Sequence, residues 1–353
     1  MFDLLSEHHW VALFGLIGGL LLGLAARLGR FCTLGAIEDM LYGGSNVRMR
    51  MWGVAIGVAI IGSFLLMSTG WLVDSSTYYL SIRWMPMASI AGGLVFGYGM
   101  ALSGNCGYGA VARLGGGDLR SFVIVLVMGV ATFVALSGPL APIREYLFYQ
   151  SDVTLGETPP GIAHILSGTL GLPIAAIGMA IGLTVLAFAA ASKELWKKPM
   201  QVFWAAAVGL GVIIGWAGTA WVAREGFEAL PVVSHSFAAP LGESIMWWMT
   251  GSARPLSFAV GSIAGVWVGA FIGSLIRGHF RWEACEDPRE LRRQILGAAL
   301  MGVGAVTALG CSVGQGLSAF SVLALSAPVT FLAIFVGAAL GLRQLIMGFQ
   351  PAE

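Results

Sequence analysis

Long apolar runs, each about as long as a lipid bilayer is thick, constrain this chain more than any other feature. The first runs from Trp10 to Leu28, and polar clusters separate it from those that follow. Apolar residues follow one another without a two-residue alternation, which is typical of membrane-spanning helices and not of barrel strands. Hydrophobic residues make up 57% of the 353 residues and charged residues only 10%, far from the balance of a soluble domain. The lipid bilayer is therefore the predicted surrounding of this chain.

The apolar runs predict an all-α polytopic membrane protein with about nine transmembrane helices plus short re-entrant helices. With the N-terminus outside, alternation of these spans leaves all but four of the 19 Lys and Arg residues on the cytoplasmic side. The four outer ones are Arg83, Arg144, Arg224 and Arg254. Such a bias predicts a multi-pass protein of the bacterial inner (cytoplasmic) membrane, with a periplasmic N-terminus and a cytoplasmic C-terminus. The predicted spans are residues 10–28, 52–71, 87–103, 119–138, 173–191, 202–221, 256–276, 295–309 and 328–345.

Two segments of the chain repeat each other, with Cys106 aligned to Cys311. The matching residues lie in the third and eighth predicted spans, which alternation sends into the membrane from opposite faces. This arrangement predicts an inverted internal repeat with pseudo-two-fold symmetry. The second half has no cysteine that corresponds to Cys32. Within a single membrane domain, 1–353, the first repeat is expected at about 1–138, the second at about 202–345 and a connecting region at about 139–201. The aligned glycines are Gly92, Gly97, Gly99 and Gly109 with Gly297, Gly302, Gly304 and Gly314.

Both repeated spans are short and run into a glycine-rich loop that carries a cysteine, GNCGYGA or GCSVGQG. About 20 residues are needed to cross the hydrocarbon, so these loops are expected to begin within the membrane. Backbone that leaves a helix at that depth must be buried in protein or line a polar cavity. Paired interrupted segments indicate a binding site near the midplane. A third such loop surrounds Cys32, and short helices are expected near 36–42 and 317–325.

The chemistry of these loops suits an anion. Short helices that begin at glycine-rich loops direct free N–H groups and a partial positive charge toward the cavity. Thiols are weak, polarizable donors that suit a sulfur atom better than a hard oxygen. The competing structural interpretation is that each free cysteine acts as a small buried hydrophobe. The expected substrate-binding residues are Cys32, Cys106, Cys311, Gly104, Asn105, Gly107, Gly109, Gly310, Ser312, Gly314, Gln315 and Arg30.

Several other classes of site are not indicated. The four cysteines form no CxxC pair and have no metal-ligand spacing with the histidines, so no metal and no cofactor is expected. A net charge of +1 implies no nucleic-acid partner. The carboxylates fall outside the span interiors, which disfavours a buried proton relay. Cys285 lies in a polar loop and is interpreted as a surface thiol, while Asp118 is predicted to cap the fourth span.

Taken together, the three loops closely resemble those of the YeeE/YedE family of sulfur-transport membrane proteins. The resemblance covers essentially the whole chain and implies a compact, hourglass-like fold that takes up thiosulfate, with the three cysteines contacting the anion in turn. It also implies a small cytosolic sulfurtransferase as partner, for which the Arg-rich loop 277–293 is a docking candidate. Asn105 stands where the family often has a second glycine. The motifs are GRFCTLGA at 29–36, GNCGYGAVARLGGGDLRS at 104–121 and GCSVGQGLSA at 310–319.

The sequence thus predicts a transporter of thiosulfate or a related anion, and not an enzyme. Two alternatives stay open. One is a membrane sulfur-relay enzyme in which a cysteine becomes a persulfide, since a helix N-terminus can activate a thiol. The other is a transporter of another sulfur or selenium compound, because Asn105 departs from the family pattern.

Overall fold

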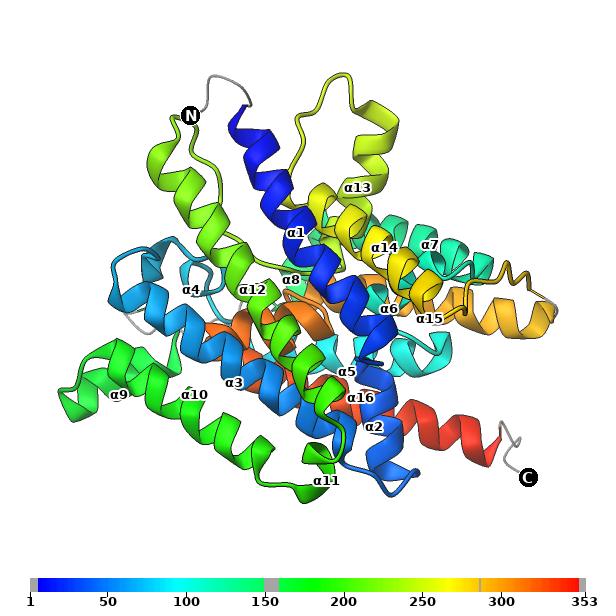
Figure 1. Cartoon of the computed structure of the whole chain (residues 1–353). Coiled ribbons are helices and arrows are strands. Elements are labelled where there is room, and N and C mark those ends of the chain that lie inside the picture. Colours follow the sequence, from blue (N-terminus) through cyan, green and yellow to red (C-terminus); the bar gives the residue numbers. More distant parts are fainter. Residues whose placement is uncertain (1–5, 149–158, 286, 349–353) are drawn as a thin grey trace.

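The computed structural model describes residues 6–148, 159–285 and 287–348, and its long elements are helices (Figure 1). Each predicted span coincides with one of them. The connecting region adds shorter helices, α8 (Ala141–Phe148), α9 (Ile162–Leu170) and α11 (Lys193–Trp196). The long helices are α1 (Glu7–Leu28), α3 (Val47–Ser68), α5 (Pro86–Ser103), α7 (Leu119–Leu136), α10 (Ile174–Ala190), α12 (Pro199–Glu225), α14 (Phe258–Ile276), α15 (Pro288–Thr307) and α16 (Ser326–Met347).

The helices identify a multi-pass membrane protein. Within the described residues, seven helical stretches are long and apolar enough to cross a membrane, or eight if the bent pair α9 and α10 forms one span. Helix α15 is not among them, because its first two turns carry Arg289, Glu290, Arg292 and Arg293. The predicted number of nine spans therefore stays a prediction, with α15 as the helix on which it depends.

Short helices follow each of the three cysteine loops. Helix α2 (Thr33–Leu41) has Cys32 as its N-cap, and α6 (Gly107–Gly115) has Cys106. After Cys311 the chain is helical at once and includes a π-helical stretch, Gly314–Ala319. The expected short helices near 36–42 and 317–325 were therefore placed too late in the sequence. The reason is that each cysteine itself stands at the helix start, where its extended or turn backbone lets the next residues enter the helix.

The glycine stripes bring helix backbones into direct contact. A Cβ atom at Gly15 would lie 2.9 Å from the Ser262 nitrogen, and one at Gly23 would lie 2.7 Å from the Ala270 nitrogen. Opposite them, Gly265 of α14 faces the backbone of α1 at Leu16 and Leu20. Only glycine permits helices to approach this closely, so the stripes serve packing, as the sequence predicted.

Helices α5 and α15 cross through a reciprocal set of glycine contacts. A Cβ at Gly99 would lie 2.6 Å from the Gly297 carbonyl oxygen, and a Cβ at Gly297 would lie 2.6 Å from that of Gly99. Likewise, a Cβ at Gly92 would lie 2.7 Å from the Gly304 carbonyl oxygen, and a Cβ at Gly304 would lie 2.8 Å from that of Gly92. Since the earlier residue of one helix meets the later residue of the other, α5 and α15 run antiparallel. These four glycines are among the eight that the 205-residue offset between Cys106 and Cys311 aligns.

Neighbouring helices follow the same pattern. Helix α5 packs on α16 in the way that α15 packs on α7. Likewise, α12 packs on α3 and α1 packs on α14. Helix α2 contacts α3 and α16, and the short helix α13 (Ala239–Thr250) contacts α14 and α7. In Figure 1, α13 lies toward the end of the molecule that holds the start of α1, whereas α2 lies toward the opposite end.

The connecting region joins the two halves at their outer surface. Helix α10 packs on α3, which belongs to the first half. Just before α9, the Ile162 N–H donates to the Leu323 carbonyl at 2.8 Å, and the Leu325 N–H donates to the Pro160 carbonyl at 3.0 Å. Leu323 and Leu325 both lie in the segment between the π-helical stretch and α16. The connecting region therefore holds the segment that follows the Cys311 loop.

Candidate functional site

Cys106 lies in the break between α5 and α6, deep inside the protein. Helix α5 ends at Gly104, whose φ of 75° is a left-handed conformation that glycine adopts without strain. The Cys106 sulfur accepts the Gly109 N–H at 3.4 Å, and the residue is 1% exposed. Arg113, at the far end of α6, donates to the Gly104 carbonyl at 3.1 Å and so closes the loop.

Cys311 occupies the corresponding break after α15. Its sulfur accepts two backbone hydrogen bonds, from Phe237 N–H at 3.2 Å and Gly314 N–H at 3.3 Å. The Ser236 hydroxyl lies 3.7 Å from the same sulfur. Because the sulfur already accepts two bonds, the S–H proton is available to a further acceptor.

The three cysteine loops meet at one place. The Cys106 sulfur is close enough to both Cys32 and Cys311 to interact with them electrostatically, and more strongly with Cys32. Phe237 connects the other two loops, since its N–H bonds to Cys311 while its carbonyl oxygen lies against Gly107. Cys106 thus interacts with both other thiols, and we refer to Cys311, Cys106 and Cys32, in this order, as the thiol series.

Two predicted site residues beside these thiols carry polar groups that have no protein partner. Asn105 is 1% exposed, and neither its amide nitrogen nor its amide oxygen makes a hydrogen bond. Ser312, also 1% exposed, lies beside the Cys106 thiol, and its hydroxyl makes no hydrogen bond of ordinary geometry. A buried polar atom without a partner costs about 1–3 kcal/mol, so such atoms are uncommon unless a ligand or water completes them.

Gln315 is used within the protein instead. It is fully buried, and its Nε2 donates to the carbonyls of Ala308 and Leu309, both at 3.1 Å. Its Oε1 accepts the Ser326 hydroxyl at 3.1 Å. Leu309 has a φ of 57°, a conformation that costs a branched residue free energy. Gln315 therefore holds the strained turn before Cys311, and its predicted contact with substrate remains a prediction.

Cys32 and Arg30 stand at the third loop. Cys32 is partly exposed, and Arg30 is exposed with a φ of 56°. Arg48 was not predicted as part of the site, yet its guanidinium lies against Gly35 in the first turn of α2, on the side where the Cys32 Cβ also lies. Arg48 also pairs with Asp39 at 3.3 Å. This end of the thiol series thus has a cation close to it.

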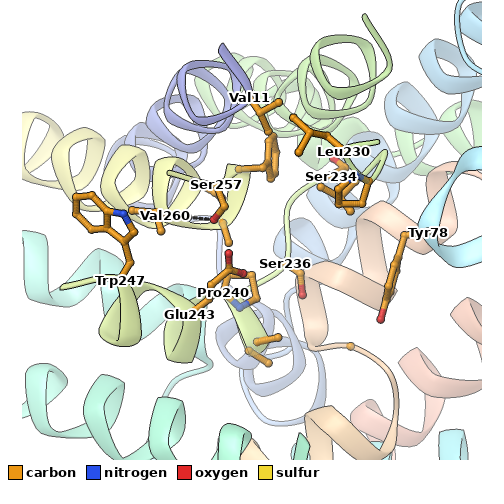
Figure 2. Close-up of a pocket in the computed structure, with 18 of the residues that line it drawn as sticks. Val11, Tyr78, Leu230, Ser234, Ser236, Pro240, Glu243, Trp247, Ser257 and Val260 are labelled. Carbon is orange, nitrogen blue, oxygen red and sulfur yellow. Dashed lines mark hydrogen bonds between the residues drawn. The ribbon is translucent and has the colours of Figure 1, made fainter. Parts of the chain in front are cut away.

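A cavity of about 510 Å³ reaches the other end of the series (Figure 2). Gly310 lines it directly before Cys311, and Tyr79 and Ser236 line it beside the same thiol. The starts of α1 and α14 and the end of α7 also contribute, so these three helix ends share one face. The volume falls within the range typical of small-molecule sites, about 300–1,000 Å³.

No sequence pattern indicates Ser236, Tyr79 and Arg48, because serine, tyrosine and arginine in polar segments usually face solvent. Only the fold shows that the segment before α13 reaches the centre. Among the predicted glycines, Gly107 and Gly109 form the first turn of α6, and Gly314 donates its N–H to Cys311. Their predicted contact with the substrate stays a prediction. Cys285 is partly exposed and donates to the Asp287 carbonyl at 3.2 Å, away from the other thiols.

Comparison with known sequences decides the family. The profile of a family described as sulphur transport matches residues 28–340. The chain belongs to the sulphur transport family. This assignment places it among transporters and not among enzymes, as the sequence predicted.

Two relatives in this family are named thiosulfate transporter TsuA. The protein of Escherichia coli K12 is 28% identical over 323 residues, which cover 86% of each chain. The protein of Spirochaeta thermophila is 26% identical over 322 residues, which cover 88% of this chain and 92% of the relative. The residues matched by the family profile, 28–340, include all three cysteine loops.

Proposed function

We propose that this chain carries thiosulfate, or a related sulfur-containing anion, inward across the bacterial inner membrane. The observation that supports this most directly is the series Cys311, Cys106, Cys32, three thiols of which Cys106 interacts electrostatically with both others, beside an Asn105 amide that is buried and has no protein partner. Soft thiol donors suit the terminal sulfur of thiosulfate, and amide and hydroxyl groups suit its oxygens. The names of the two relatives agree with this substrate.

The two halves form an inverted repeat in this proposal. Reciprocal contacts of Gly92 with Gly304 and of Gly99 with Gly297 are what a pseudo-two-fold axis between α5 and α15 requires. Such an axis lies in the membrane plane when the two copies are inverted, and the substrate site then lies where they meet. The hourglass-like shape follows if a second opening on the inner side mirrors the outer cavity.

The direction of transport follows from charge. The cavity beside Cys311 is lined by the start of α1, which the N-out orientation places in the periplasm. Arg30 and Arg48 lie at the Cys32 end, among the basic residues that the positive-inside rule assigns to the cytoplasm. Arginines there offer an arriving anion a charged exit, and a small cytosolic sulfurtransferase would receive it on the same face, at loop 277–293.

Uptake of labelled thiosulfate into liposomes that contain only this purified protein tests the proposal. We expect Cys106→Ala and Cys311→Ala to lower the initial rate about tenfold or more, as loss of a hydrogen bond to a charged group does. Cys285→Ala is the matched control, because that thiol lies at the surface and should not matter. Unchanged uptake in both buried variants, at equal protein content, would contradict the proposal.

The sulfur-relay alternative is favoured by one observation, the two N–H groups directed at the Cys311 sulfur. Such donors also stabilise a negatively charged sulfur. In a relay, that thiolate would attack the terminal sulfur of thiosulfate, forming a persulfide while the S–S bond breaks and sulfite leaves. Mass spectrometry during uptake separates the two functions. An added sulfur atom on Cys311 and released sulfite would support the relay, whereas intact thiosulfate inside the liposomes and no adduct would support transport.

A further inference from the structure

Ser236 lies in the segment before α13, and the 205-residue offset pairs the next residue, Phe237, with Cys32 of the first half. Cys32 directly precedes α2, which packs on α3 and α16, and it lies beside the Cys106 thiol. Ser236 lies just before α13, which packs on α14 and α7, and its hydroxyl lies 3.7 Å from the Cys311 sulfur. Helices α3 and α14, and likewise α16 and α7, have matching positions in the two halves. The second half therefore has a hydroxyl, that of Ser236, beside its central thiol, and the first half has a thiol, Cys32, beside its own.

A second hydroxyl joins Ser236. The Tyr79 side chain is 5% exposed, and its hydroxyl is within hydrogen-bonding reach of Ser236. A Cβ at Gly314 would lie 2.7 Å from the Ser236 oxygen and 2.8 Å from the Tyr79 oxygen. The absence of a side chain at Gly314 thus leaves room for both hydroxyls beside the helix start that follows Cys311.

Both hydroxyls face the outer cavity. Ser236, Tyr79 and Gly310 line its wall next to Cys311, while most of the remaining lining is apolar (Figure 2). Figure 2 shows Ser236 within the group of side chains that surrounds this space. A mainly apolar cavity with a few convergent polar groups is the usual form of a small-ligand site.

We propose that Ser236 and Tyr79 form an outer binding station that holds the oxygen end of the incoming anion, while Cys311 meets its sulfur end. This inference rests on the proposed function and adds an orientation to it. Hydroxyl protons are harder donors than thiol protons and prefer oxyanion oxygens. The outer station therefore binds the sulfonate group, and an inner station at Cys32 binds the sulfur atom. The substrate class is then an anion with both a sulfonate group and an exposed sulfur atom.

Matched pairs of variants in the liposome assay test the station. Ser236→Ala and Tyr79→Phe should each raise the KM for thiosulfate, on the order of tenfold for a hydrogen bond to a charged group, and should leave kcat nearly unchanged. Ser236→Thr, which keeps the hydroxyl, should restore the KM. The controls line the same cavity: Ser234→Ala, whose hydroxyl already donates to the Val212 carbonyl, and Tyr78→Phe.

A labelling experiment gives a readout that does not depend on uptake. In a Cys285→Ser background, Ser236→Cys should react with a charged, membrane-impermeant methanethiosulfonate reagent added from the cavity side, and thiosulfate should protect it. The parent without the new cysteine reports reaction at the native thiols. Sulfate, which has the oxygens but no exposed sulfur, should protect less than thiosulfate does.

The outcomes separate this inference from the proposed function. If the unmodified protein takes up no thiosulfate, the proposed function fails, and protection at position 236 still decides whether the station binds the anion. If uptake is normal but the KM values of Ser236→Ala and Tyr79→Phe equal those of the controls, the station is wrong and the proposed function stands. Absence of protection by thiosulfate would likewise overturn the station.

Discussion

The Phe237 backbone N–H donates a hydrogen bond of 3.2 Å to the sulfur of Cys311. Through its carbonyl, Phe237 also lies against Gly107, at the start of the helix that Cys106 caps. One residue of the second half thus fixes the relative positions of two thiols that lie far apart in sequence. The arrangement of these two thiols therefore depends on the segment before α13 as well as on the cysteine loops.

Asn105 should show opposite effects on stability and on transport. Asn105→Leu keeps the approximate shape but removes two buried polar atoms that lack partners, so we expect the free energy of unfolding to stay equal or to rise by about 1 kcal/mol. Thiosulfate uptake should fall, because the amide is then missing beside Cys106. Thermal unfolding in detergent and liposome uptake measure the two effects. The chain's other asparagine supplies the control, since Asn46 is exposed and Asn46→Leu should leave uptake unchanged. A drop in both quantities for Asn105→Leu would indicate a structural role only.

Gln315→Leu should destabilise the Cys311 loop. The substitution leaves the carbonyls of Ala308 and Leu309 without their donor, which costs about 1–3 kcal/mol in a buried position. We expect a lower melting temperature and reduced uptake. Adding Leu309→Gly should recover part of the stability, because glycine adopts the φ of 57° without strain. If Gln315→Leu kept full stability and changed only the KM, then Gln315 would contact the substrate directly, as the sequence predicted.

The α5–α15 crossing should tolerate no side chain. Gly99→Leu places atoms where a Cβ would already lie 2.6 Å from the Gly297 carbonyl oxygen, so we expect a loss of about 3 kcal/mol or more, or a protein that does not fold. Size-exclusion profiles and melting temperatures in detergent report the loss. Gly168→Leu serves as control, since nothing lies within 4 Å of the position its Cβ would take. Equal melting temperatures for the two variants would show that the helices do not meet at this crossing.

Acid should weaken the contact between the segment after α3 and helix α9. The His164 Nε2 and the Asp74 carboxylate lie 2.8 Å apart. Burial raises the pKa of Asp74, but its hydrogen bonds with His164 and the Ser75 N–H outweigh this effect, so that its pKa lies below the ordinary value. A carboxyl with a lowered pKa adds stability above its unfolded pKa, about 3.9, and this stability is lost as the pH falls through the folded pKa. The difference in melting temperature between the unmodified protein and Asp74→Asn should therefore be present at pH 7 and shrink below about pH 4. A difference that stays constant over this range would contradict the ionic contribution.

Positions of the helices follow from the sequence because apolar runs such as Trp10–Leu28 have no alternative to spanning the bilayer. The three cysteine loops could also be predicted from the sequence, since glycine next to cysteine at the end of a short span is an unusual local pattern. Ser236 and Tyr79 could not be predicted, because their place beside Cys311 depends on how the segment before α13 and the short helix α4 (Tyr78–Ser81) pack. For Gln315 the sequence predicted a contact with the substrate, which stays a prediction, but it did not reveal the partners within the protein, two backbone carbonyls and the Ser326 hydroxyl.

The hydrogen bonds of Pro160 and Ile162 with Leu325 and Leu323 bear on how the protein moves. They attach the connecting region to the second half, while α10 rests on α3 of the first. Because the region contacts both halves, we expect it to resist rocking of one half against the other. Passage of the anion should then require displacement only of side chains and loop segments around the thiols, within a frame that keeps its shape throughout the transport cycle.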